Sequence, residues 1–414
     1  MCKVIQNGTT HYPGLRKLIV LSILFIIFFD AFFSFLLGPL FREATLTVFL
    51  LIASVYVFVI PKDYISRRNF LPFLVTCSAM FAFLISIPVW KSWHNAYSYL
   101  GIPVAFLVYH TDFAYTKKKI YQLLILAFIL ACYEFLSQRY LFVNTIIKNG
   151  EIITYDLKTA GGANAVLRVK AYFYGCLSLG LFALGVAFLY SKRIWILLLC
   201  LLTALMAGTR SALLCMLPMI LLQDSSKKRI STYLVIGLTM MGVSLFVMQY
   251  SPSSWDRIIG VFELTDGHSN RFLMWKTGWQ QFLSESGIHM LLGNNGAFFL
   301  NYNNNPESGW ICLLTDNGIV GFLIYFLPIA YLGFRFFMQR QLYLLFVLGL
   351  FTGINFGVTF HLSGTGNLVY WLCVFNFHEC ALLHGKMLFP DSTEREKHEN
   401  PPSLQILLPD RRRN

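Results

Sequence analysis

The stretch that decides the fold is residues 194–222, which read IWILLLCLLTALMAGTRSALLCMLPMILL. The apolar run is interrupted only at Gly208-Thr209-Arg210-Ser211. A single helix here would place the basic clusters Lys192–Arg193 and Lys227–Arg229 on opposite sides of a bilayer, although cytoplasmic loops normally carry the Lys and Arg residues. Two short helices with a tight turn at residues 208–211 keep both clusters on one side. The stretch therefore predicts a helical hairpin that holds Arg210 at or just below the outer membrane surface.

The composition extends this interpretation to the whole chain. Of its 414 residues, 56% are hydrophobic and 13% are charged, whereas soluble proteins carry roughly 25% charged residues. Many apolar runs reach the roughly 20 residues that a helix needs to cross a bilayer. A water-soluble globular protein is excluded, and we expect an all-α polytopic membrane protein of about twelve transmembrane helices. The expected spans lie near 15–37, 40–60, 70–89, 96–110, 120–137, 171–190, 194–208, 211–222, 230–250, 309–332, 342–360 and 368–389.

The placement of charge predicts the orientation. The net charge is +13, but the basic residues form short clusters between apolar runs, which indicates the lipid bilayer rather than nucleic acid as the partner. With both termini cytoplasmic, every short cytoplasmic loop is basic. We expect one transmembrane domain over 1–389 and a charged, Pro-containing, disordered cytoplasmic tail over 390–414. Two long loops, about 138–170 and 251–308, then lie on the periplasmic face.

The long outer loops favour an enzyme over a transporter. Transporters tend to bind substrate near the bilayer midplane, between spans that contain charged residues. Only Asp30 and Glu134 are charges of that kind here, and they suggest no pair. The chain also has no GxxxxGK[ST] phosphate loop, so ATP hydrolysis is not expected. A transporter or flippase remains the alternative from another functional class.

Arg210 is the first candidate for a functional side chain, because charge within or beside a membrane is energetically expensive. A guanidinium beside Ser211, near the start of the next helix, could bind two oxygens of a phosphate group. The alternative is that Arg210 extends to the interface only to reach water.

The large loop holds the second candidate. Its apolar or aromatic residues 272, 275, 279 and 282 are three or four positions apart, which predicts an amphipathic helix. Such a helix could lie on the membrane surface, with Arg271 and Lys276 toward lipid head groups and Trp275 beside them. The alternative is an ordinary packed helix with a solvated charged face. The following Leu292-Gly-Asn-Asn-Gly296 segment is capable of tight turns.

The third candidate is Glu307, in the segment Pro306-Glu-Ser-Gly-Trp310 just before the span at 309–332. Glu307 is the only acid in residues 286–315. Its carboxylate could accept a proton from a hydroxyl group; the alternative is a helix N-cap or first-turn acid. Asp316 and Asn317 follow on the same span, where Gly318 and Gly321 would permit close packing.

These segments resemble the superfamily of O-antigen polymerases and O-antigen ligases, bacterial inner-membrane glycosyltransferases that act on undecaprenyl-diphosphate-linked glycans. The resemblance rests on Gly208-Thr-Arg-Ser-Ala, Arg271 followed by Trp275, Glu307-Ser-Gly-Trp, Leu313-Leu314 and Asn317-Gly-Ile-Val-Gly321. It covers the whole topology and is sharpest over about 205–325. It implies a periplasmic active site in the inner membrane, and a chain-length-determining co-polymerase as a partner.

Within this superfamily the resemblance favours the polymerase branch. The ligases carry a histidine near the end of the large loop, whereas here the chain reads Asn-Pro-Glu-Ser-Gly-Trp and has no histidine between His289 and His361. We therefore expect a Wzy-type polymerase of undecaprenyl-diphosphate-linked oligosaccharide repeat units, for O-antigen or capsular polysaccharide. The alternative within enzymes is a ligase that moves the glycan to lipid A-core.

The resemblance also implies the roles of individual residues. The expected catalytic residues are Glu307, Arg210 and Arg271. The expected substrate-binding residues are Arg210, Ser211, Arg271, Trp275, Lys276, Ser308 and Trp310. No metal site and no cofactor are expected, because the histidines are scattered and a diphosphate is already a good leaving group.

Overall fold

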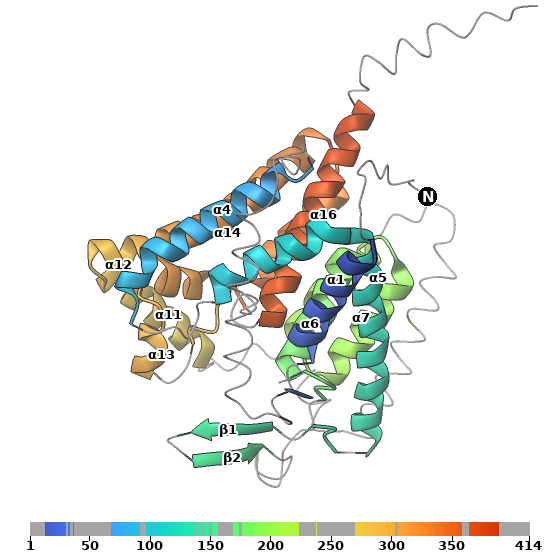
Figure 1. Ribbon diagram of the computed structural model, residues 1–414, viewed down its shortest axis with the longest axis horizontal. Helices are drawn as coiled ribbons and strands as arrows, with labels where there is room; N and C mark the ends of the chain where they lie inside the picture. Colours follow the sequence, from blue (N-terminus) through green and yellow to red (C-terminus); the bar gives the residue numbers. More distant parts are fainter. Residues whose placement is uncertain are drawn as a thin grey trace, which may run out of the picture.

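The structure is a computed structural model in which most of the described chain is helical (Figure 1). The described residues are 13–29, 32–33, 36, 68–91, 97–137, 139–142, 144–148, 151–155, 169–173, 176–222, 237, 270–302, 305–357 and 364–388. The helices in the first half are α1 (Pro13–Phe28), α4 (Phe70–Ser86), the 3-10 helix η2 (Ile87–Val89), α5 (Tyr97–Ser137), α6 (Cys176–Leu189), α7 (Ile194–Met206) and α8 (Arg210–Leu221). Those in the second half are α11 (Asn270–Ser284), α12 (Gly287–Leu292), α13 (Ala297–Tyr302), α14 (Gly309–Met338), α15 (Leu342–Ile354) and α16 (Gly364–Leu388).

Among the described residues, three stretches are long and apolar enough to cross a membrane: Phe70–Val89, Ser98–Ser137 and Gly309–Met338. Large apolar side chains such as Phe81 and Phe334 point outward from them, as lipid contact requires. The membrane character expected from the composition is thereby supported. The predicted spans 40–60 and 230–250 lie outside the described residues, so the total of about twelve spans stays a prediction.

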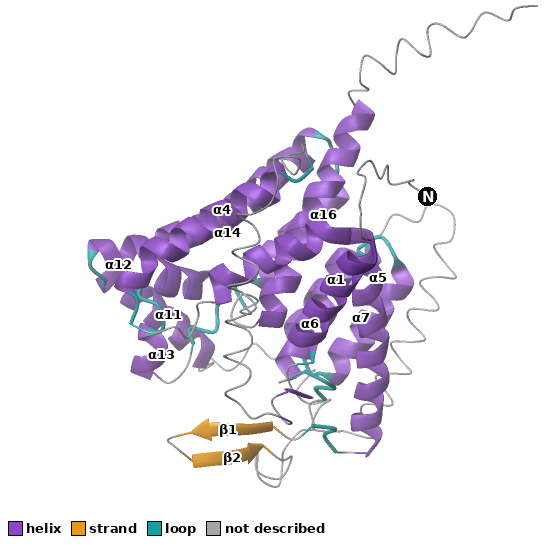
Figure 2. Cartoon of the chain, in the orientation of Figure 1, coloured by secondary structure: helices purple, strands orange, loops and turns teal. Residues whose placement is uncertain are grey.

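The described chain is mainly helical, as expected, with one addition in an outer loop. Strands β1 (Asn144–Lys148) and β2 (Glu151–Tyr155) form an antiparallel hairpin within the predicted outer loop 138–170, drawn in orange in Figure 2. The pairing aligns Ile146 with Ile153 and Ile147 with Ile152. β-branched residues such as these isoleucines favour strands. This signal is present in the sequence, but no hairpin was predicted from it.

The predicted spans 96–110 and 120–137 form a single bent element, α5. Its backbone leaves helical geometry at Asp112, whose side chain accepts the N–H of Tyr115 at 2.9 Å and so caps the second half. Figure 1 shows the two halves running in different directions. The chain therefore changes direction between the two predicted spans through this bend. A short basic loop had been predicted there.

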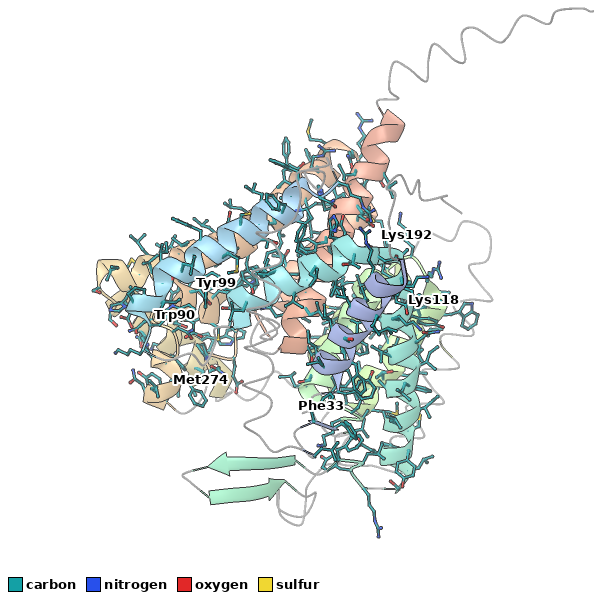
Figure 3. The ribbon with its side chains drawn as sticks, viewed as in Figure 1. Phe33, Trp90, Tyr99, Lys118, Lys192 and Met274 are labelled. Atoms are coloured by element: carbon teal, nitrogen blue, oxygen red, sulfur yellow. The ribbon has the colours of Figure 1, made fainter. Side chains whose placement is uncertain are left out.

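Several described basic residues of the predicted cytoplasmic segments gather at one end of the molecule. Lys17 and Lys119 both lie over the Tyr115 ring, at 5.6 and 5.4 Å. The Tyr190 hydroxyl donates to the Lys117 carbonyl oxygen at 2.7 Å, and Arg193 lies 5.6 Å over the Tyr190 ring. Figure 3 shows Lys118 and Lys192 at this end and Trp90 and Met274 at the other. The clustering agrees with a common side for the basic loops.

Glu134, at the opposite end of α5, holds the start of the outer loop to its end. The buried carboxylate accepts backbone N–H groups from Leu141 at 2.9 Å, Lys170 at 2.8 Å and Ala171 at 2.9 Å. These three backbone donors satisfy the hydrogen-bonding capacity that the buried carboxyl group must fill. Glu134 thus has a structural role, which removes one of the two charges that would have suited a transporter.

Candidate functional site

The α7–α8 hairpin places Arg210 at the first position of α8. Helix α7 ends against Gly208, whose φ of 63° closes the turn, and the Thr209 N–H donates to the Ala204 carbonyl at 3.1 Å. A Cβ on Gly180 of α6 would lie 1.9 Å from the Thr209 Oγ1, so the turn is pressed tightly onto α6. The predicted hairpin is confirmed at the backbone level.

Contacts between α8 and α15 show what lies beside this turn. The Cys215 sulfur is 4.0 Å from the Leu350 carbonyl oxygen, and the Tyr343 hydroxyl is 3.5 Å from the Met219 carbonyl oxygen. The two helices therefore run antiparallel. Continuing this register by little more than one helical turn places the start of α8 level with the end of α15, near Asn355.

The end of α15 in turn holds the start of α14. The Asn355 carbonyl accepts the Gly309 N–H at 2.7 Å and the Trp310 N–H at 3.3 Å. The Trp310 indole N–H donates to the Thr352 carbonyl at 3.1 Å. Arg210 and the segment that carries Glu307 are thus brought to the same end of the molecule, on either side of the α15 terminus.

Glu307 occupies an unusual backbone conformation at this junction. Its φ is 56°, a left-handed value that is uncommon for a residue other than glycine and frequent at functional sites. Helix α14 begins at Gly309, its N-cap is Ser308, and its first turn contains no acid. Glu307 therefore precedes the N-cap residue instead of occupying that position. The side chain is half-buried.

Helix α11 packs against the Glu307 segment through Gly278. A Cβ at Gly278 would lie 2.8 Å from the Ile311 Cγ2 and 3.1 Å from the Pro306 Cβ. Arg271 is in the first turns of α11, about two turns before Gly278 and on the same side of the helix. The predicted helix is confirmed, and it packs through Gly278; of its predicted apolar stripe, Phe282 is buried whereas Phe272 and Trp279 are exposed.

The segment 293–296, which follows α12, packs against α14 where that helix is interrupted at Gly318. We call this contact the α12–α14 joint. Helical geometry fails at Gly318, which has φ 64° and ψ −168°. The Asn294 N–H donates to the Thr315 carbonyl at 3.0 Å, and the Gly296 N–H donates to the Asp316 carboxylate at 3.3 Å. The segment predicted to form tight turns therefore anchors the large loop to a membrane helix.

A buried polar layer fixes the broken part of α14 from its other side. The Ser98 hydroxyl donates to the Asn317 Oδ1 at 3.0 Å, and the Tyr99 hydroxyl donates to the Asn317 carbonyl at 3.2 Å. The Tyr325 hydroxyl and the Asn367 Nδ2 both donate to the Ser98 carbonyl, at 2.5 and 3.2 Å. Helices α5, α14 and α16 are thereby tied together beneath the site.

The structure describes the predicted site residues to different extents. The backbones of Arg210, Ser211 and Arg271 are placed, whereas their side chains lie outside the described part. Lys276 is exposed and Trp275 is half-buried. Ser308 and Trp310 are buried, and the Trp310 indole N–H is engaged with protein. Trp310 thus packs between α14 and α15, and its role in substrate binding stays a prediction.

An open pocket between α11 and α13 is lined by polar residues that were not predicted as a site from the sequence. The pocket has a volume of about 440 Å³ and includes Gln280, Gln281, Glu285 and Asn301 in its lining. The signal was present as a polar stripe at helical spacing on α11, since residues 277, 280, 281 and 284 are all Thr, Gln or Ser.

The described residues contain no group of three or more His, Cys, Asp or Glu side chains arranged to hold a metal ion. No protein-family model matches the chain, and no curated protein is significantly similar to it. The assignment of a function therefore depends on the residues and their arrangement.

Proposed function

We propose that the chain is a glycosyltransferase of the bacterial inner membrane that polymerises undecaprenyl-diphosphate-linked oligosaccharide repeat units at the periplasmic face. The product would be an O-antigen or capsular polysaccharide. The observation that carries the proposal is the convergence of three segments at one end of the molecule. These are the Arg210 turn beside Asn355, the Glu307 segment held by that same residue, and the Arg271 helix packed onto it.

In the proposed reaction, a sugar hydroxyl of the incoming repeat unit attacks the anomeric carbon of the growing glycan. The new C–O bond forms as the bond to the diphosphate oxygen breaks, and undecaprenyl diphosphate leaves with the electron pair. Glu307 takes the hydroxyl proton as general base. Arg210 and Arg271 bind diphosphate oxygens, for which the planar guanidinium is suited because it donates two parallel hydrogen bonds. The protein then contributes mainly positioning and charge stabilisation.

The way the large loop is attached supports a role in catalysis rather than transport. Broken membrane helices bind ions or substrates in many transporters, but the break at Gly318 is filled by the chain's own Gly293–Gly296 segment. The arrangement packs the Arg271 helix against the segment that carries Glu307. Preorganised groups stabilise the transition state of a group-transfer reaction. A transport pathway, by contrast, must open and close.

The experiment is elongation of synthetic lipid-linked repeat units by the purified full-length chain in detergent or proteoliposomes, followed on gels. Stepwise lengthening without ATP or a nucleotide sugar is expected, and Glu307→Gln should abolish it. Glu379→Gln, which alters the Arg68 ion pair at the basic end of the molecule, is the matched control and should leave the ladder intact.

Two other outcomes would overturn the proposal. Transfer of preformed polymer to lipid A-core without lengthening would identify a ligase. Movement of lipid-linked units across the bilayer without glycosyl transfer would identify a flippase. A co-polymerase that sets chain length is a further proposed partner, and adding one should change the length distribution but not the requirement for Glu307.

A further inference from the structure

The pocket between α11 and α13 has a lining that suits a ligand rich in hydroxyl groups. Its volume of about 440 Å³ falls within the range of roughly 300–1,000 Å³ that is usual for small-molecule sites. Gln280, Gln281 and Asn301 contribute amide groups, each of which can both donate and accept hydrogen bonds. A sugar ring presents neighbouring hydroxyls that need both kinds of partner.

Glu285 and Gln281 of the lining offer hydrogen-bonding groups to a ligand. The Asn294 Nδ2 donates to both carboxylate oxygens of Glu285, at 3.0 and 3.1 Å, which fixes the carboxylate while leaving lone pairs free to accept from a hydroxyl. Gln281 is half-buried in the lining and adds an amide donor there.

The charges and the aromatic group in the pocket favour a neutral sugar over a phosphate. Lys91 and Glu285 are the charged residues of the lining, one of each sign. A diphosphate site would need an excess of cationic donors. Tyr302 is 47% exposed and its ring is supported by Phe298 at a centroid distance of 4.6 Å. The exposed part of this ring offers an apolar surface for the C–H groups of a sugar.

The pocket is also rigidly connected to the proposed catalytic end. Asn294 holds Glu285 with its side chain and donates its own N–H to the Thr315 carbonyl of α14. Helix α11 contacts Pro306 through Gly278, next to Glu307. Figure 3 shows Met274 of α11 at the same end of the molecule as Trp90 and Tyr99. A sugar bound in the pocket would therefore be held at a constant distance from Glu307.

From these observations we infer that the pocket between α11 and α13 binds a neutral sugar residue of the glycan, at a subsite separate from the reacting bond. The inference rests on the proposed function, because that function supplies the glycan. It assigns Gln281, Glu285 and Asn301 as hydrogen-bonding residues and Tyr302 as the apolar wall of the subsite.

The test is direct binding of a glycan that lacks the lipid diphosphate. The probe is the free oligosaccharide released by mild acid from the organism's own lipid-linked repeat units, titrated into the full-length detergent-solubilised protein by calorimetry or saturation-transfer NMR. We expect Gln281→Ala, Asn301→Ala and Glu285→Gln each to raise the Kd by about three- to tenfold. The control Ser286→Ala changes an exposed serine of the same loop, whose side chain makes no capping bond, and should leave the Kd unchanged.

Binding separates the pocket from the proposed function, because it requires no catalysis. Glu307→Gln should bind the oligosaccharide normally even if it cannot polymerise. If the wild type does not bind the oligosaccharide, or if the pocket variants bind as well as the wild type, the subsite inference is overturned, whatever the elongation assay shows. Pocket-dependent binding by a wild-type protein that does not elongate repeat units would support the subsite and refute the polymerase.

Discussion

Replacing Gly318 by alanine should release the large loop from the membrane helix that anchors it. Gly318 has φ 64° and ψ −168°, a region that is essentially restricted to glycine. A Cβ added there would lie 2.4 Å from the Leu291 carbonyl oxygen and 2.5 Å from the Gly293 nitrogen. Both neighbours are backbone atoms, so neither can move aside by changing a rotamer. The α12–α14 joint would have to open.

The size of the effect follows from these contacts. A side chain in such a conformation costs about 1–3 kcal/mol, and separating the segments adds about 0.5–1.5 kcal/mol for the lost hydrogen bond between the Asn294 N–H and the Thr315 carbonyl. Gly333→Ala is the matched control on the same helix, because its nearest neighbour is a Leu348 methyl at 3.7 Å. Alanine in a helix is favoured over glycine by up to about 1 kcal/mol, so Gly333→Ala should be neutral or stabilising.

The assay combines unfolding by a denaturing detergent with limited trypsin digestion. We expect Gly318→Ala to lower the free energy of unfolding by about 2–4 kcal/mol and to speed cleavage after Arg271 and Lys276 in α11. Gly333→Ala should do neither. If the two variants unfold at the same detergent concentration and are cleaved at the same rate, the α12–α14 joint does not hold the loop, and the argument for a preorganised site fails with it.

Glu307→Gln should lower the rate of elongation by about 10² to 10⁴, the usual worth of a general base, while the protein accumulates normally; a normal glycan ladder would refute the base assignment. Arg210→Lys and Arg271→Lys keep the charge but lose the two-pronged hydrogen bonding, so both should reduce polymer in the cell; wild-type ladders from both would exclude bidentate diphosphate binding. Glu134→Gln should cost about 1.5–3 kcal/mol, because charge-assisted bonds to three N–H groups are weakened, and protease should then cut within 138–170 faster; unchanged cleavage there would show that the carboxylate does not hold the loop.

The first residue of α14 could not be predicted from the sequence. Glu307, Ser308 and Gly309 are all compatible with a helix start by residue type, so an acid cap was a fair alternative. The choice depends on the Asn355 carbonyl, which accepts the N–H groups of Gly309 and Trp310 from another helix. A partner some 46 residues away along the chain leaves no local trace in the sequence.

The sequence by itself determined the membrane character of the protein, the α7–α8 hairpin and the helix α11, because apolar run length, helical spacing and turn-forming glycine are local properties. It could not determine that Gly318 breaks α14 to receive the Gly293–Gly296 segment, nor that α11 and α13 border an open polar pocket. Both depend on backbone groups and side chains from separate segments meeting in space. Their pairing is selected by the packing of the whole chain, since buried polar groups must find partners wherever the fold places them.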